Sequence, residues 1–578
     1  SVSEQFSVTE GIVIRGVSLR LNDSGNFASG MVLDGGTLEI TDQPTLSGVL
    51  SQQAASRIKL GENAVLTTSQ AVDLGSSVLS LEGPGTFSNA QAFALDQAGG
   101  GLELSEGVVI TGALELGEGV LQVSGDTQVS GALSLTADAS VQIAASKTLN
   151  YSGPEVSIGQ GTLRLEGGGE LLNEGALTLD DPLSGLWLDG IGRLSSVRVD
   201  AAAGEDSGIR VSAPAEVTAV EFNAAGGILL DEGAALSGAI RLNPGSSLSP
   251  SGAGSLASDM DLAGGHLSIS DVRSLSGTVS LSASSSIEVT DNLTLAHSSG
   301  LGLGPYTLSL SGGGLLKVPG DLKLDDALSE LVLSGVTLER ASTSSASKGI
   351  RVESDSSIST LTVSHATPLD VSANADLSGH VELGSPGALE LTGAGQVSST
   401  LGLSGGSLEV SESMPWSGRW SQTADGTLEI AQEKVLSYGG GSHELGTHSL
   451  EIKGAGEFEL TAAQAALVLD DPGSLLALSG SGGIPRVLVK ATPAEARGLR
   501  ITGQPTLAGL EFQVDSSLSV SEQFSVTEGI MIRGVSLTLM DNGTFASDLV
   551  LDGGTLEITG KPTFMKQLIQ QTASRIKL

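Results

Sequence analysis

The chain has no cysteine, few aromatic residues and few basic residues, and each shortage excludes a class of protein. Without cysteine there is no small disulfide-stabilised scaffold. Aromatic residues make up 3% of the chain, too few to anchor a large globular core on Trp and Phe. Only 28 Lys and Arg face 66 Asp and Glu, and the resulting net charge of −38 opposes nucleic acid and anionic membrane surfaces. No apolar run approaches the roughly 18 residues of a membrane helix, so we expect no membrane insertion.

What is abundant is glycine and aliphatic residues in short alternating patterns. Glycine supplies 80 of 578 residues and hydrophobic residues 39%. From residue 114 onward, tripeptides with two apolar residues around a polar one recur, as at Leu114, Leu121 and Leu133, often at a spacing of about seven residues and at a longer one in places. This alternation is typical of half-buried strands, and Gly, Ser, Asp, Asn and Pro between them are turn residues. The only segment with an ambiguous pattern is 565–574, which could form a short helix.

Short strands at this spacing fit either an antiparallel sandwich or a parallel β-solenoid, in which each strand stacks on its equivalent one turn later. A motif Leu-x-(Leu/Ile)-x-Gly-x-Gly followed by an Asp-bearing strand occurs four times. Asp180, Asp325 and Asp470 are evenly spaced at intervals of 145, whereas Asp96 precedes Asp180 by only 84. A solenoid can lose whole turns because each turn contacts only its neighbours. We therefore predict an all-β, parallel β-solenoid, right-handed, with about three strands per turn of roughly 21 residues.

The end of the chain repeats its beginning. Residues 519–578 match residues 1–60 at 45 of 60 positions without a gap. We interpret residues 1–518 as one repeat unit and 519–578 as the start of the next, within a longer repetitive polypeptide. No linker or low-complexity tract interrupts the sequence, so we predict one continuous solenoid over 1–578, with about 25 turns and ~120 Å of length per repeat.

A Gly-Gly-x-Leu-x-(Val/Ile) signature begins at Gly35, Gly264, Gly405 and Gly553, with a shortened form at Gly100. It resembles the strand repeats of bacterial autotransporter passengers and filamentous haemagglutinin-like adhesins. This resemblance implies a right-handed β-helix at the cell surface. The long repeats and the lack of a continuous Asn ladder depart from those families.

The paired aspartates are the first candidate site. Adjacent residues on a strand point to opposite faces, so a pair such as Asp180 and Asp181 cannot act as a facing acid–base dyad. Successive copies lie about seven turns and roughly 30 Å from one another, which is too far to share a calcium ion. We expect these residues to begin turns and to accept backbone hydrogen bonds.

The histidines and the aromatic pairs give the remaining candidates. His443 and His448 form the only close histidine pair, and the other four histidines are scattered: His266, His297, His365 and His380. No motif fixes a metal or nucleophile geometry, so we expect no catalytic residue and no metal site. Trp416 and Trp420 flank Arg419 and form the densest aromatic spot. If exposed, they would bind a ligand by stacking on a sugar, and if buried they would fill the core.

Together these features predict a structural segment of an extracellular filament, sheath or adhesin stalk in a giant bacterial surface protein, without catalysis or a cofactor. Its partners would be further copies of itself along the chain and side by side, and surface glycans. Calcium is a candidate at contacts between neighbouring acidic solenoids. The alternatives are a carbohydrate- or surface-binding β-helix module, and a polysaccharide-active β-helix enzyme, which would need clustered carboxylates in a deep groove.

Overall fold

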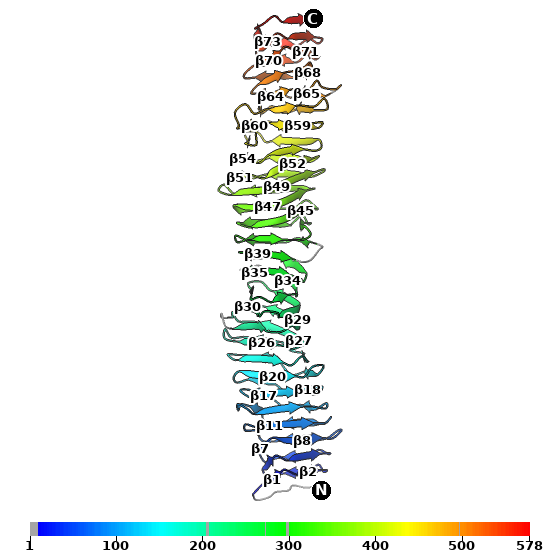
Figure 1. Ribbon diagram of the computed structural model, residues 1–578, viewed down its shortest axis with the longest axis vertical. Coiled ribbons are helices and arrows are strands. Elements are labelled where there is room, and N and C mark those ends of the chain that lie inside the picture. Colours follow the sequence, from blue (N-terminus) through cyan, green and yellow to red (C-terminus); the bar gives the residue numbers. More distant parts are fainter. Residues whose placement is uncertain (1–9, 204–206, 272, 296–299, 496) are drawn as a thin grey trace. The chain divides into compact units, whose positions relative to one another are not determined.

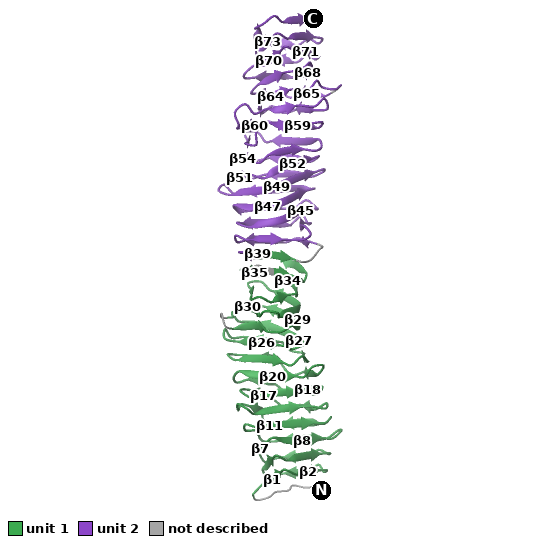
Figure 2. Cartoon of the chain, in the orientation of Figure 1, with its two compact units in different colours: residues 1–286, 293–297 green, residues 287–292, 298–578 purple. Residues whose placement is uncertain are grey.

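The computed structural model describes residues 10–203, 207–271, 273–295, 300–495 and 497–578. In these ranges the regular secondary structure consists of β-strands alone, from β1 (Ile12–Arg15) to β77 (Arg575–Lys577). The chain forms two compact units, shown in Figure 2: residues 1–286 with 293–297 (unit 1), and residues 287–292 with 298–578 (unit 2). The all-β parallel solenoid is confirmed in each unit, whereas its handedness and the continuity of residues 1–578 as one domain stay predictions.

Unit 1 is built on a long parallel ladder to which each turn contributes one strand (Figure 1). These strands are four to six residues long and pair in register with the turns before and after them. We call this sheet the first sheet of unit 1. Its strands are β2 (Ser18–Leu21), β5 (Thr37–Ile40), β8 (Ser56–Leu60), β11 (Val78–Glu82), β14 (Gly101–Leu104), β17 (Val120–Val123), β20 (Ala139–Ile143), β23 (Thr162–Glu166), β26 (Gly185–Asp189), β28 (Gly208–Val211), β30 (Ala225–Leu230), β32 (Ser247–Ser251) and β35 (His266–Ile269).

Two further strands usually complete a turn of unit 1. One example is the turn that contains β11, followed by β12 (Thr86–Asn89) and β13 (Phe93–Leu95). From β27 (Arg193–Val199) to β31 (Ala235–Leu242) the second and third strands are merged. Strand β27 pairs with both β24 (Glu170–Asn173) and β25 (Leu177–Leu179), and β31 pairs onward with two separate strands, β33 (Ser255–Leu256) and β34 (Asp259–Ala263). The sequence of β27, RLSSVRV, contains no glycine, proline or aspartate that would separate two strands. The predicted three strands per turn therefore become two in this part of the unit.

Unit 2 has the same organisation. Its second and third strands merge in β45 (Thr337–Thr343), which pairs with β42 (Leu315–Lys317) and β43 (Leu322–Leu324). The first sheet of unit 2 consists of β41 (Thr307–Ser311), β44 (Glu330–Ser334), β46 (Gly349–Ser354), β48 (Ala366–Val371), β50 (Ala388–Leu391), β53 (Ser407–Val410), β56 (Gly426–Ile430), β59 (Ser449–Gly454), β62 (Leu475–Leu478), β65 (Gly498–Ile501), β68 (Ser516–Val520), β71 (Ser536–Leu539), β74 (Thr555–Ile558) and β77.

Columns of aliphatic side chains fill the interior of each unit. Because register is kept from turn to turn, one apolar position stacks on the same position in the next turn. In unit 1 one such column, in which every side chain is at most 1% exposed, is Leu38, Ile58, Leu81, Leu104, Val123 and Ile143. Burial of each such side chain contributes roughly 1.5–3 kcal/mol, so the stack needs no large aromatic core.

The turns explain the glycines of the four-copy motif. Gly83 and Gly454 have φ values of +94° and +87°, a region that favours glycine. A Cβ atom at either residue would lie within 2.1 Å of a backbone oxygen of the preceding turn. The equivalent residues Gly167 and Gly312 have the same conformation and the same close approach. The motif therefore marks a corner at which successive turns touch through their backbones.

The short helix considered for residues 565–574 does not form. This segment contains β76 (Leu568–Gln570), which pairs in parallel with β73 (Leu549–Asp552) on the preceding turn. The edge of that turn offers unpaired backbone groups, and pairing with them overrides the weak helical pattern of the segment.

The duplicated ends fold alike where the structure describes both. Strands β70 (Ile530–Arg533), β71 and β73 repeat β1, β2 and β4 (Met31–Asp34) one repeat unit further along the chain. Even the isolated bridge between Arg15 and Gly35 recurs between Arg533 and Gly553. Residues 1–9 of the first copy lie outside the described residues.

Candidate functional site

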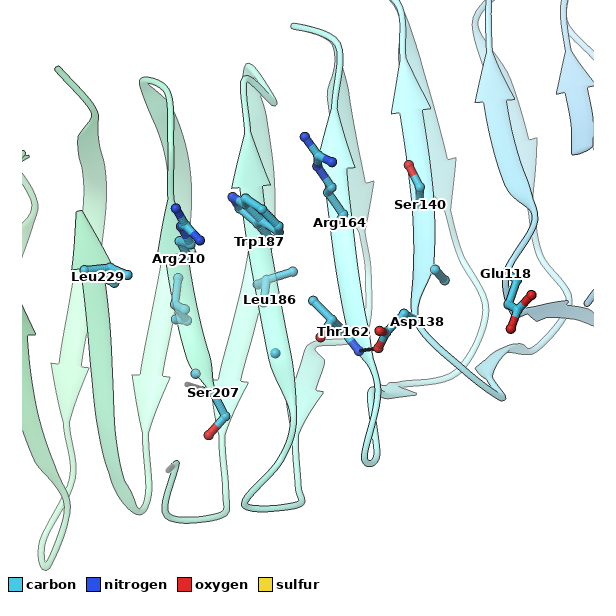
Figure 3. A pocket seen from close by; sticks show the side chains of 14 residues that line it. Glu118, Asp138, Ser140, Thr162, Arg164, Leu186, Trp187, Ser207, Arg210 and Leu229 are labelled. Atoms are coloured by element: carbon cyan, nitrogen blue, oxygen red, sulfur yellow. Dashed lines mark hydrogen bonds between the residues drawn. The ribbon is translucent and has the colours of Figure 1, made fainter. Parts of the chain in front are cut away.

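A groove of about 480 Å³ lies on the outer face of the first sheet of unit 1, and we call it the Trp187 groove. It crosses neighbouring turns from Glu118, just before β17, to Leu229 in β30 (Figure 3). These five steps between adjacent strands correspond to ~24 Å along the solenoid axis. The groove is therefore long, open and carried on regular strands.

One wall of the groove is a row of outward side chains. Strand register aligns Ser140, Arg164, Trp187, Arg210 and Leu229 on five successive turns. Figure 3 shows this row crossing the adjacent strands. The row exists because each residue occupies the outward position of an alternating strand, with buried aliphatic residues on either side of it.

Trp187 is held between two guanidinium groups. The Cζ atom of Arg164 lies 4.6 Å from the ring centroid, and that of Arg210 lies 4.5 Å away on the neighbouring turn. These distances match the spacing between strands, so both cations sit over the ring in cation–π geometry. The indole Nε1 donates a hydrogen bond to Ser212 Oγ at 3.1 Å, which fixes the ring orientation.

Carboxylates pair with both guanidinium groups. Nε of Arg164 lies 2.5 Å from Oε1 of Glu166, and its Nη2 donates to Asp189. Nε and Nη2 of Arg210 donate to Oδ2 of Asp231 at 3.1 and 3.0 Å. The hydrogen bond from Arg164, followed by one from Ser212, holds the pKa of the Asp189 carboxyl below its usual value. The two guanidinium groups are thus outnumbered by three carboxylates, in keeping with the acidic chain as a whole.

The floor of the groove is formed where side chains are missing. Strand register places Thr162, Gly185 and Gly208 in the outward column beside the Arg–Trp–Arg row. Gly208 has φ of +96°, and a Cβ atom there would lie 3.0 Å from Gly227 O. A Cβ at Gly185 would meet the Thr162 hydroxyl at 3.0 Å. The two glycines therefore leave a trough that larger residues would fill or distort.

The structure places Trp416 and Trp420 in the interior of unit 2. Their exposed fractions are 0% and 8%, and their ring centroids lie 6.1 Å apart, edge to face. Trp416 Nε1 donates to Ser399 O at 2.7 Å, and Trp420 stacks on Phe458 at 5.5 Å. A sugar-binding platform would depend on exposure of these rings, which the structure does not show. The two rings instead fill the core, which is the role expected of them if they are buried.

His443 belongs to the same aromatic cluster and does not join His448 in a site. It is 1% exposed, and its ring centroid lies 5.9 Å from that of Trp420. Burial lowers its pKa to about 4, so the ring is neutral at pH 7. In the described part of the chain no group of three His, Cys, Asp or Glu residues has the arrangement of a metal site. His297 lies outside the described residues.

The paired aspartates build the same turn three times. In unit 2, Gly304 N donates to Asp325 Oδ1 at 2.8 Å, and Leu328 N donates to Asp326 Oδ1 at 2.9 Å. Ser329 Oγ accepts from Asp326 N at 2.9 Å and donates to Gly304 O at 2.6 Å. The networks at Asp180–Ser184 and Asp470–Ser474 are equivalent. The aspartates therefore accept backbone hydrogen bonds in turns, as the sequence predicts.

Trp187 was not predicted from the sequence, because no other aromatic residue lies close to it along the chain. The signal was present: Trp187 lies one turn after Arg164 and one turn before Arg210, at equal separations in the sequence. No protein-family model matches the chain, and no curated protein matches it either. Across the described residues there is no helix long and apolar enough to cross a membrane.

Proposed function

We propose that the chain is a structural segment of an extracellular filament, sheath or adhesin stalk on a bacterial surface, and that it works without catalysis or a resident cofactor. The observation that carries this proposal is the parallel ladder of each unit. Every strand inside it is hydrogen-bonded to the turns on both sides, over columns of buried aliphatic residues. Such a ladder resists bending and stretching because extension must break many backbone hydrogen bonds together.

The proposed partners follow from charge and repetition. Further copies of the same sequence would continue the ladder, since an open solenoid edge otherwise exposes unpaired strands. Acidic solenoids with a net charge of −38 repel one another side by side, so bundles would need calcium or a bridging partner such as surface glycans. Bundles loosened by a chelator support the calcium contact, and bundles unchanged by the chelator contradict it. The proposal includes neither binding to nucleic acid nor insertion into a membrane.

The experiment that tests the proposal is to measure the native polypeptide in source material by denaturing gel and peptide mapping. We expect a chain several times longer than 578 residues, with peptides that join Leu578 to a segment resembling residues 61–66. Surface labelling of intact cells should modify this chain. A native chain of this length that is protected inside the cell would refute the stalk and favour a discrete binding protein or enzyme.

A further inference from the structure

We propose that the Trp187 groove binds a linear, uncharged glycan. This inference goes beyond the stalk and does not depend on it, because the groove lies within unit 1 alone. It concerns a different tryptophan from the two that the sequence singles out.

The shape of the groove selects an extended ligand. It runs along the solenoid axis for ~24 Å but is open to solvent, so a chain of several sugar rings would lie in it lengthwise. Its strands, β23, β26 and β28, are each paired on both sides. No free backbone edge is available at the floor, which excludes a peptide that binds by adding a strand.

The polar lining suits hydroxyl groups, which both donate and accept hydrogen bonds. Exposed carboxylates of Glu118 and Asp138 provide acceptors at one end of the groove, where Asp138 Oδ1 already accepts a hydrogen bond from Thr162 N at 2.8 Å. Thr162 contributes a hydroxyl to the lining. The side chains of Arg164 and Arg210 are 41% and 45% exposed, and each guanidinium group has five N–H donors, more than its ion pairs use.

The excess of carboxylates over guanidinium groups disfavours an acidic ligand, and the apolar lining suits a sugar. Each guanidinium is already paired with carboxylates, so an acidic ligand would meet Glu166, Asp189 and Asp231 as well as the arginines. The edge of the Trp187 ring and the 40% exposed Leu229 offer apolar surface to the C–H groups of a sugar ring. The faces of Trp187 are covered by guanidinium groups, so recognition would use the ring edge and the flanking donors.

Tryptophan fluorescence gives a specific test, because Trp416 and Trp420 are buried and Trp187 is the half-buried reporter. Acrylamide quenching is measured with cellohexaose, maltohexaose and N-acetylchitohexaose, each up to roughly 10 mM, and with hexagalacturonate as the acidic probe. We expect at least one neutral hexasaccharide to protect Trp187 and to bind in calorimetry. Arg164→Ala should weaken that binding by about tenfold or more.

Arg241→Ala is the matched control, since Arg241 is also an ion-paired, outward arginine of unit 1 but lies in another groove, with Asp261. The affinity of the Arg241→Ala variant for the hexasaccharide should stay within about twofold of that of the unsubstituted protein. Trp187→Ala is a second variant, read by calorimetry after circular dichroism shows an unchanged strand content. Binding of hexagalacturonate alone, lost in roughly 0.5 M salt, would overturn the uncharged ligand. Binding of no probe, or equal losses in the Arg164 and Arg241 variants, would overturn the site.

Discussion

Replacing Ser329 by alanine should open one corner of unit 2 without unfolding the rest. The Ser329 side chain is 0% exposed and its hydroxyl joins two backbone groups. It accepts a hydrogen bond from Asp326 N at 2.9 Å and donates one to Gly304 O at 2.6 Å on the preceding turn. The Ser329→Ala variant would leave both groups without this partner. An unsatisfied buried group costs about 1–3 kcal/mol, and water reaches the partly exposed Asp326 and Gly304, so we expect a total loss of ~2 kcal/mol.

Native-state hydrogen exchange is the suitable assay because a solenoid opens locally and one global free energy does not describe it. The Asp326 amide should exchange about 30-fold faster in Ser329→Ala, the factor that ~2 kcal/mol implies. Amides of β65 and β68, many turns away, should keep their rates. Ser344→Ala, an exposed serine after the neighbouring strand β45, is the control and should change little.

The same substitution at Ser184 and Ser474 extends the test. Both serines make the equivalent pair of hydrogen bonds, in the copies of the turn that precede and follow the one at Ser329. We expect losses within about 0.5 kcal/mol of one another, because all three serines are at most 1% exposed and make the same two hydrogen bonds. An unchanged Asp326 amide, or an equal effect in the Ser344 control, would refute the reasoning.

Three further predictions use the core and the titrating groups. Trp416→Ala should cost about 3–5 kcal/mol in local unfolding free energy because the ring is fully buried, whereas Trp187→Ala on the surface should cost about 1 kcal/mol, both measured by hydrogen exchange. His443 has a folded-state pKa of about 4 against 6.5 unfolded, so its stabilising effect is complete above pH 6.5 and is lost as pH falls toward 4. Between pH 7 and 5 the local unfolding free energy around His443 should fall by roughly 2 kcal/mol, and hydrogen exchange of His443→Leu should show a smaller loss; an identical pH dependence would contradict the assignment. Burial, together with the neighbouring carboxylates of Glu429 and Glu390, raises the pKa of Glu409. Glu409→Gln should therefore stabilise unit 2 by about 0.5 kcal/mol at pH 7 and have no effect at pH 3, where the carboxyl is protonated. A gain of equal size at pH 3 would exclude charge repulsion as the cause.

Much of the fold could be predicted because solenoid register is written into the sequence at short range. An apolar–polar–apolar tripeptide defines one strand, and glycine or Asp-Asp defines the corner after it. The even spacing of Asp180, Asp325 and Asp470 marks equivalent corners, which the hydrogen-bond networks of those turns reproduce.

What could not be predicted depends on contacts between turns. The merging of strands in β27 and β45 needs two conditions: no glycine, proline or aspartate within the merged strand, and two neighbouring strands that both pair with it. Residues 565–574 join a sheet because the previous turn offers an edge. The Arg–Trp–Arg row is visible only after equivalent positions of successive turns are aligned. Its two steps are equal in length, but earlier turns are shorter, so no single period runs through the whole sheet.

Small-angle X-ray scattering of the monomeric chain tests most directly whether the protein is one stiff stalk segment. At about 21 residues per turn and about 4.8 Å per turn, a continuous solenoid of 578 residues has a maximum dimension of roughly 130 Å and the scattering profile of a thin rod. A dimension near half that value, or a profile that requires two units free to move against each other, would contradict the stalk.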